Sequence, residues 1–372
     1  MSIKIEDFCT YAPKSDLKAG EASKDGQYVF FTSSEDESKR YADYQFDGEG
    51  IIMGTGGNAT LHYYYGKYAV STDCIVLIPD TRVRCKYLYY FFLANMHILE
   101  AGFKGAGLKH TNKKYIGSIE LAAIPSLQEQ DFVIKIFDKV SGVIKGRILE
   151  LSVLDDLIKA RFVEMFGDPV NNPKGWVVDT LGQYMTVLTD FSANGSYELL
   201  DSNVVMRDEP DYAVMVRTTD LESGNFESGI KYIDQHAYEL LSKSKLFGGE
   251  LIMNKIGSAG KIYIMPKINR PASLGRNAFM FRFDDRINLT YLYALLTTDY
   301  GEKEIQQYVR GAVTKTITKD ATRSIRIIVP PIELQEQFSS FVAQVDKSKA
   351  AVKKALDETQ ILFDSLMQQY FG

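Results

Sequence analysis

The hydrophobic pattern of the chain is dominated by two long helical stripes. Between residues 133 and 165 an apolar residue recurs every three or four positions, which puts all of them on one side of an α-helix: Val133, Phe137, Val140, Ile144, Ile148, Leu151, Leu154, Ile158, Phe162 and Met165. A second stripe has similar spacing: Phe338, Phe341, Val345, Val352, Leu356, Phe363, Leu366 and Tyr370. Pro125 precedes the first stripe and Gly167-Asp168-Pro169 follows it, so helix signals mark both of its ends. A helix of roughly forty residues would be about 60 Å long.

The stretches that come before each helix have a different pattern. They contain short runs of β-branched and aromatic residues, such as "GQYVFFTS", "GIIMGTG" and "CIVLIP", interrupted by Gly, Asp and Pro. We therefore predict an α+β chain with two globular β-rich domains, residues 1–124 and 169–329, and two long helices, residues 125–168 and 330–372. The helices can bury their stripes against each other as an antiparallel pair. The alternative is that they are core helices of one large domain.

The whole pattern occurs twice. Five pairs of segments match in the same order in the two halves of the chain: Gly50–Ala59 with Glu250–Ala259 (an offset of 200), Tyr87–Leu93 with Tyr291–Thr297 (204), Gly105–Pro125 with Gly311–Pro331 (206), the L-Q-E-Q motifs that begin at Leu127 and Leu334 (207), and Leu157–Gly167 with Leu362–Gly372 (205). Offsets that stay in order and drift by only a few residues indicate an internal repeat. Each repeat therefore consists of a globular domain followed by a long helix.

Charge distribution favours a DNA-binding protein. The 372 residues carry a net charge of −5, but residues 67–114 and 245–326 are rich in Lys and Arg, whereas residues 1–66 and 169–244 are rich in Asp and Glu. A basic section in each half can supply phosphate contacts even in an acidic chain; the alternative is an ordinary solvated surface. The three Cys form no C-x-x-C pair, the four His lack metal-ligand spacing, and no apolar run is long enough to cross a membrane. We expect a cytoplasmic protein without a metal site.

Two basic loops carry the candidate DNA contacts, "FKGAGLKHTNKKY" (residues 103–115) and "VRGAVTKTITKD" (residues 309–320). Lys and Arg can hold phosphates while Thr and Asn can contact base edges, and the turns "GTGGNAT" and "KIGSAGK" allow the backbone to approach a ligand closely. In the first half the predicted DNA-binding residues are Gly57, Asn58, Lys104, Lys109, His110, Thr111, Asn112, Lys113 and Lys114. In the second half they are Lys255, Ser258, Lys261, Arg276, Asn277, Arg310, Thr314, Lys315, Thr316 and Lys319.

The sequence contains no complete catalytic motif. Gly54–Ala59 fits a loose G-x-G-x-x-A pattern, but a strand-like stretch follows it where a dinucleotide-binding fold needs a helix. The stretch "GSAGKI" lacks the first Gly and the Ser or Thr of a P-loop, and neither G-x-S-x-G nor H-E-x-x-H occurs. We therefore predict a non-catalytic binding protein.

The ordered and duplicated motifs resemble the specificity subunit of type I restriction–modification enzymes over the full chain. The resemblance rests on "IPSLQEQ" and "VPPIELQEQF" before the helices, "LIKARFVEMFGDP" and "LFDSLMQQYFG" at their ends, "PKGWVVDTLGQY" at the start of the second domain, and "GEGIIMGTGG" and "YAVSTDCIVL" in the first. It implies two target recognition domains, each reading one half of a bipartite, asymmetric site in double-stranded DNA. It also implies that the two helices join and space these domains, and that partner subunits methylate adenine or restrict the DNA.

The same resemblance implies partners and cofactors. Two methyltransferase subunits would carry S-adenosylmethionine, restriction subunits would translocate DNA with ATP and Mg²⁺, and this chain would bind no cofactor itself. We expect methyltransferase helices to pack on the apolar stripes, at Phe137, Ile144, Leu151, Ile158, Phe162, Phe341, Val352, Leu356, Phe363 and Leu366. Three alternatives remain open: a single-chain enzyme, a duplicated adaptor that does not bind DNA, and a specificity subunit of a related system whose methylase and nuclease share one polypeptide.

Overall fold

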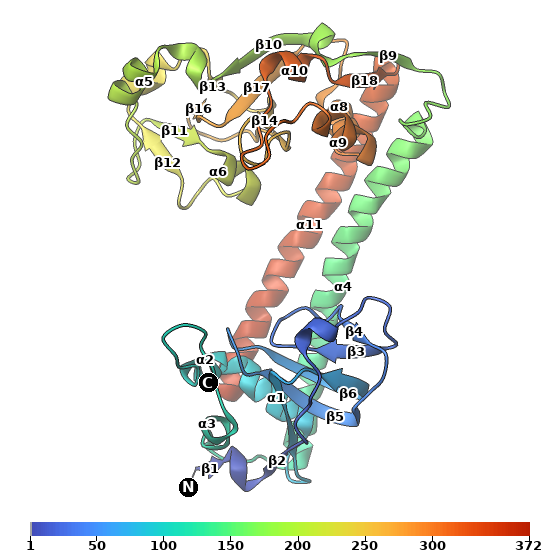
Figure 1. Cartoon of the computed structure of the whole chain (residues 1–372), viewed down its shortest axis with the longest axis vertical. Helices are drawn as coiled ribbons and strands as arrows, with labels where there is room; N and C mark the ends of the chain where they lie inside the picture. The colour runs from blue at the N-terminus through green and yellow to red at the C-terminus, as the bar shows by residue number, and fades with distance from the viewer. Residues whose placement is uncertain (1) are drawn as a thin grey trace. The chain divides into compact units, whose positions relative to one another are not determined.

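A computed structural model describes residues 2–372 of the chain (Figure 1). The fold is α+β, as the sequence predicts. Its contacts divide the chain into two compact units: unit 1 contains the residues up to Leu151 together with Ala351–Gly372, and unit 2 contains Ser152–Ala350. Each unit therefore includes part of both long helices, whereas the predicted division treated the helices as segments of their own.

Unit 1 is built on one six-stranded sheet. The strand order is β2-β7-β5-β6-β3-β4, and neighbours are antiparallel except β3 and β6. The strands are β2 (Cys9–Tyr11), β3 (Tyr28–Phe31), β4 (Arg40–Tyr41), β5 (Phe46–Gly54), β6 (Leu61–Val70) and β7 (Cys74–Pro79); β1 (Ile3–Lys4) and β8 (Glu120–Leu121) form a separate pair. The helices are α1 (Cys85–Ala94), α2 (Met96–Ala101) and α3 (Lys113–Gly117). Helix α1 lies against the sheet (Figure 1). Its Leu88 and Phe92 are fully buried in the core that the helix shares with the strands.

Unit 2 repeats this topology and adds elements to it. The order β10-β17-β14-β15 corresponds to β2-β7-β5-β6, and a second sheet has the order β12-β11-β16-β13. The strands are β10 (Met185–Asp190), β11 (Ala213–Val216), β12 (Lys231–Ile233), β13 (Lys245–Leu246), β14 (Leu251–Asn254), β15 (Ile262–Ile264), β16 (Ala272–Leu274) and β17 (Ala278–Phe283), with β9 (Val177–Thr180) and β18 (Arg326–Val329) as a separate pair. Pro266 and Pro271 lie between β15 and β16, where unit 1 has the continuous β6. Because proline cannot donate to a strand ladder, the sheet divides there.

The helices of unit 2 also follow the repeat. Helices α8 (Leu289–Leu296), α9 (Asp299–Gln306) and α10 (Lys319–Arg323) correspond to α1, α2 and α3, whereas α5 (Tyr197–Asn203), α6 (Thr218–Ser223) and α7 (Gln235–Leu240) are additions. The additions fall within the first part of the unit, before β14. They explain why the second repeat is longer than the first up to its long helix.

The two predicted long helices are present as α4 (Leu127–Phe166) and α11 (Ile332–Phe371), each 40 residues long. They run antiparallel within each unit. In unit 1 the ring centroid of Phe137 lies 5.5 Å from that of Phe363, and Arg147, further along α4, donates to the carbonyl of Ala355, earlier on α11. In unit 2 the ring centroid of Phe162 lies 5.6 Å from that of Phe338, and Asp155, earlier on α4, accepts from Nζ of Lys349, later on α11, at 2.6 Å. The two aromatic contacts belong to the hydrophobic core of their unit. Within residues 2–372 there is no helix with the length and apolar character to cross a membrane.

One buried glutamine fixes the start of each long helix. The Gln130 side-chain amide donates to the carbonyls of Arg82 (3.0 Å) and Pro125 (2.8 Å), and its oxygen accepts from the Arg84 amide (2.7 Å). In unit 2, Gln335 donates to the carbonyls of Arg286 (3.4 Å) and Pro330 (2.8 Å) and accepts from the Asn288 amide (2.8 Å).

These contacts correct the alignment of the L-Q-E-Q motifs. The offset of 207 pairs Gln130 with Gln337, but the structure pairs Gln130 with Gln335, at an offset of 205 that also relates the bounds of α4 and α11. Gln130 and Gln335 are fully buried, whereas Gln128 and Gln337 are exposed. The matching letters are therefore out of register by two residues, and the hydrogen bonds define the true repeat.

A buried carboxylate stabilises unit 2 at the end of β10. Asp190 accepts hydrogen bonds from Nζ of Lys255 and from Nζ of Lys319, each at 2.8 Å. Desolvation opposes the charged form of Asp190, but the hydrogen bonds and charges of the two lysines outweigh it, so the net effect is a lowered pKa for this carboxyl. The ion pairs connect β10 to the residue after β14 and to the start of α10.

We predict that Gln335→Ala lowers the free energy of unfolding by about 2–4 kcal/mol, because a buried amide and a buried carbonyl lose their partners. Gln337→Ala, at the exposed glutamine, should change it by less than about 0.5 kcal/mol. Urea denaturation of both variants measures the difference. Equal effects at the two positions would contradict the pairing of Gln130 with Gln335.

We also predict that Asp190→Asn lowers the free energy of unfolding by about 2–3 kcal/mol at pH 7, since two charge-assisted hydrogen bonds are lost. The folded pKa of Asp190 lies below its unfolded value of about 3.9, so its stabilisation is present above that value and is lost as the pH falls through the folded pKa. The difference between wild type and variant should therefore shrink below about pH 4. Asp320→Asn, at a carboxylate that is 96% exposed, is the matched control and should have little effect at either pH.

Candidate nucleic-acid interface

In unit 1 the Gly-rich turn after β5 pairs with the first basic loop. The Gly57 amide donates to the Lys109 carbonyl (2.9 Å), and the Thr111 amide donates to the Thr55 carbonyl (3.0 Å). The loop closes on itself through reciprocal backbone hydrogen bonds of 3.0 Å between Lys104 and His110. The structure thus brings together the two segments of this half that the sequence analysis selected separately.

Unit 2 makes the same contacts at the corresponding positions. The Gly257 amide donates to the Lys315 carbonyl, and the Ile317 amide to the Lys255 carbonyl, both at 3.0 Å. Arg310 and Thr316 close the second loop with reciprocal backbone bonds of 2.9 and 2.7 Å. The repeat therefore preserves the backbone of this turn–loop pair even where the side chains differ.

Glycines with positive φ make these pairings possible. Gly57 and Gly257 have φ of +84° and +80° at the turns, and Gly105 and Gly311 have φ of +148° and +104° at the loops. A Cβ at Gly311 would lie 2.1 Å from the Thr314 carbonyl oxygen, which is closer than any real contact. Only glycine satisfies both the conformation and the close approach.

The unit 1 loop presents uncompensated positive charge. Lys104, Lys109 and Lys114 are exposed and form no ion pair among residues 2–372, and the Lys113 ammonium lies 5.0 Å from the centroid of the Tyr11 ring. Among the other predicted residues, Asn58, His110 and Asn112 are exposed and Thr111 is buried. Asn112 caps α3 by accepting from the Tyr115 amide (3.0 Å). This loop is a cationic surface with amide and imidazole groups beside the lysines.

In unit 2 most of the predicted cations are paired within the protein. Lys255 and Lys319 bind Asp190, Lys261 pairs with Glu222, and Arg276 pairs with Asp201 at 3.0 Å. The Arg310 guanidinium donates to two backbone carbonyls near the loop and has no counter-ion within residues 2–372. Lys315 is exposed and makes no ion pair in the described chain, and the neutral residues Ser258, Asn277 and Thr314 are also exposed. The second loop therefore offers fewer uncompensated charges than the first.

Each loop also exposes an apolar residue that the sequence analysis missed. Leu108 is 70% exposed and Val313 is 98% exposed. In the sequence, the feature that could have indicated each of them is a single apolar residue inside a stretch of Gly, Lys and Thr. An exposed apolar group beside base-contacting groups can pack on the methyl group of thymine.

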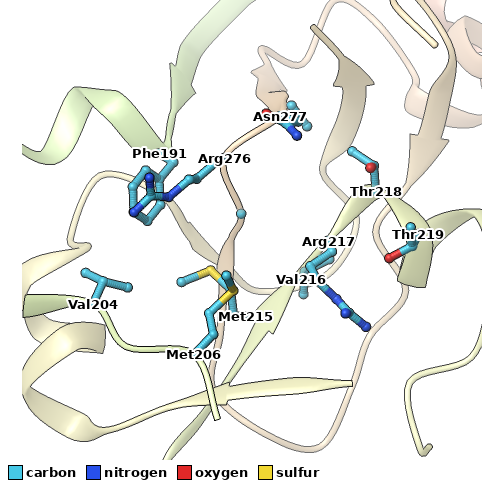
Figure 2. Close-up of a pocket in the computed structure, with 12 residues that line it drawn as sticks. Phe191, Val204, Met206, Met215, Val216, Arg217, Thr218, Thr219, Arg276 and Asn277 are labelled. Carbon is cyan, nitrogen blue, oxygen red and sulfur yellow. The ribbon is translucent and has the colours of Figure 1, made fainter. Parts of the chain in front are cut away.

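Arg276 and Asn277 line a pocket of about 330 Å³ in unit 2 (Figure 2). Its apolar side chains include Phe191, Val204, Met206, Met215 and Val216, and its polar ones include Arg217, Thr218 and Thr219. The Arg276 guanidinium carbon lies 5.1 Å from the Phe191 ring centroid, so the cation covers the ring (Figure 2). The pocket combines an apolar lining with hydroxyl, amide and guanidinium groups.

Five of the ten predicted partner-packing residues pack in the cores of the two units: Phe137, Ile158, Phe162, Phe363 and Leu366. Phe137 and Phe162 are buried, and the other eight (Ile144, Leu151, Ile158, Phe341, Val352, Leu356, Phe363 and Leu366) are half-buried. In its unit 2 part, α4 instead exposes Val153, Leu157 and Val163, by 56%, 45% and 53%. These three residues lie within one broad face of the helix. We call them the α4 apolar face; the sequence analysis missed it because the regular stripe on the other side was the stronger signal.

Comparison with known proteins identifies the family. A family model described as "Type I restriction modification DNA specificity domain" matches residues 1–152 and 173–359. The chain is 23% identical over 327 residues to the type I restriction enzyme MjaVIII specificity subunit of Methanocaldococcus jannaschii, covering 82% of this chain and 75% of that protein. It is 24% identical over 143 residues to the EcoDI specificity subunit of Escherichia coli, covering 38% and 32%.

Solved structures show the same fold. The crystal structure of the type I restriction–modification S subunit from M. genitalium has a TM-score of 0.61 at 13% identity and covers 100% of this chain and 96% of its own. A structure concerned with complex assembly and conformational transition of the type I system has a TM-score of 0.52 at 14% identity and covers 100% and 97%. Since the family model matches both repeats, the chain belongs to the type I restriction–modification DNA specificity family: it is a specificity subunit, not an enzyme in its own right.

Proposed function

We propose that each unit is a target recognition domain that reads one half of a bipartite site in double-stranded DNA. The observation that carries this proposal is the turn–loop pair, which recurs with the same backbone hydrogen bonds at Gly57 and Gly257. The side chains on the two loops differ, so the two half-sites should differ in sequence and the complete site should be asymmetric.

The residues of the interface divide into two roles. The exposed and unpaired Lys104, Lys109, Lys114 and Lys315 are suited to phosphates, because an ammonium binds an anion without reading sequence. Asn58, Asn112 and Thr314 can exchange hydrogen bonds with base edges, and Leu108 and Val313 can pack on thymine methyl groups. The lysines paired with Asp190 hold the second loop in place and are assigned to the scaffold instead.

The partners of this chain are two methyltransferase subunits and ATP-driven restriction subunits. This chain directs their adenine methylation or restriction to the site. S-adenosylmethionine, ATP and Mg²⁺ belong to those subunits. A methyltransferase subunit docks on the α4 apolar face, because Val153, Leu157 and Val163 leave about half of each side chain in water without a partner in this chain. The positions one repeat later on α11 are Glu358, Leu362 and Gln368, so this face is specific to α4.

A triple variant tests the DNA interface. Replacing Lys104, Lys109 and Lys114 by Ala should weaken binding of duplex DNA and reduce its salt dependence by up to about three units in log Kd against log salt, one for each lost phosphate contact. The measurement is a DNA titration of the complex with its methyltransferase subunits at several salt concentrations. The control replaces Lys135, Lys139 and Lys145, which are exposed on α4 and unpaired in the described chain. If both variants change the slope equally, the basic loop is not the DNA interface.

A second triple variant tests the docking surface. Replacing Val153, Leu157 and Val163 by Gln removes about 1 kcal/mol or more of binding energy per side chain, so the methyltransferase subunit should bind about a hundredfold more weakly. The domains should stay folded, because all three side chains are already exposed. The control replaces three exposed valines elsewhere in unit 2, Val170, Val177 and Val205, by Gln. Unchanged copurification of the subunit with the α4 variant would rule out this surface.

A further inference from the structure

The register of the two sheets shows which residues correspond beside the turn–loop pairs. In unit 1, Tyr11 pairs with Leu77 and Leu77 pairs with Ile51. In unit 2, Leu188 pairs with Phe281 and Phe281 pairs with Leu251. Ile51 and Leu251 are related by the offset of 200 that the turns also follow, so Tyr11 corresponds to Leu188. Two residues further along the chain, Pro13 therefore stands where unit 2 has Asp190.

The residues that face this position correspond as well. The turn–loop hydrogen bonds equate Thr55 with Lys255 and Thr111 with Ile317. Lys113 lies two residues after Thr111, and Lys319 lies two residues after Ile317, so these two lysines correspond. Each begins the short helix that follows its loop. In unit 2 the Asp190 carboxylate binds both lysines of this set, whereas at the corresponding positions unit 1 keeps one lysine and no carboxylate, and Lys113 forms no ion pair among residues 2–372.

Unit 1 has a hollow of about 230 Å³ at this position. Its polar lining comprises Lys14, Thr55, Thr72, Thr111, Asn112 and Lys113, and its lining contains no Asp or Glu. The charged side chains that line the hollow, Lys14 and Lys113, are therefore both cationic, so the hollow suits an anion.

We propose that this hollow binds a phosphate group, which takes the place that the Asp190 carboxylate occupies in unit 2. The ammonium groups of Lys113 and Lys14 would balance its charge. The phosphate is either a phosphodiester of bound DNA or a free phosphate. The first source rests on the proposed function of the neighbouring loop, whereas the second does not.

The Pro13→Asp variant tests the site because it places a carboxylate in unit 1 at the position that Asp190 occupies in unit 2. In the full chain, inorganic phosphate at constant ionic strength should raise the melting temperature of the wild type by several degrees near saturation, about the shift expected for a specific ligand. Pro13→Asp should abolish this shift, because its carboxylate would pair with Lys113. Thr10→Asp adds the same charge on the exposed side of β2 and should keep the shift. Lys113→Met should also abolish it, so the test does not depend on one variant.

Salt-dependent DNA binding distinguishes the two sources. A phosphodiester in the hollow predicts that Pro13→Asp lowers the slope of log Kd against log salt by about one unit more than Thr10→Asp does. A free phosphate predicts the same slope for both variants together with a lost melting shift in Pro13→Asp. If Pro13→Asp and Lys113→Met behave like Thr10→Asp in both measurements, the hollow is not a phosphate site. That failure is separate from failure of the DNA interface, which the Lys104, Lys109 and Lys114 variant reports.

Discussion

Aromatic packing between α4 and α11 completes the core of each unit, and the rest of the architecture depends on it. In unit 1, Phe137 is fully buried against Phe363 and Phe371; in unit 2, Phe162 and Phe166 are buried against Phe338. Most of each regular stripe is covered in this way, which stabilises the helices by burying apolar surface, although Ile148 of α4 is 54% exposed. Because most of the stripe is covered within the chain, the α4 apolar face is the more exposed surface for assembly with other subunits.

The fold was largely predictable, because its main signals are summed over many residues. A stripe that recurs for about forty residues located both helices to within two residues of their observed ends. The repeat was equally clear, but its register at the helix starts was not. Identical letters favoured Gln337 as the partner of Gln130, whereas burial and hydrogen bonding select Gln335. Letter identity cannot show which of two nearby glutamines points into the core.

The candidate site was predictable as a pair of loops but not as a pattern of charge. The lysines of the Gly-rich loops were visible in the sequence, and in the structure backbone hydrogen bonds join each loop to its turn. Asp190, however, lies 65 residues before Lys255 and 129 before Lys319, so nothing local marks these lysines as ion-paired. The two repeats have thus kept one backbone arrangement while changing how its charge is balanced. A duplicated scaffold of this kind can change what it binds without changing how it folds.

The division of the chain into units has a consequence for the order in which the protein is made. Unit 2 lies within the single stretch Ser152–Ala350, whereas unit 1 needs Ala351–Gly372 to cover Phe137. During synthesis from the N-terminus, the first recognition domain is translated first but completed last, and its apolar surface stays open while the second domain is made. A frameshift or nonsense change in the last turns of α11 would therefore impair the domain encoded at the opposite end of the gene.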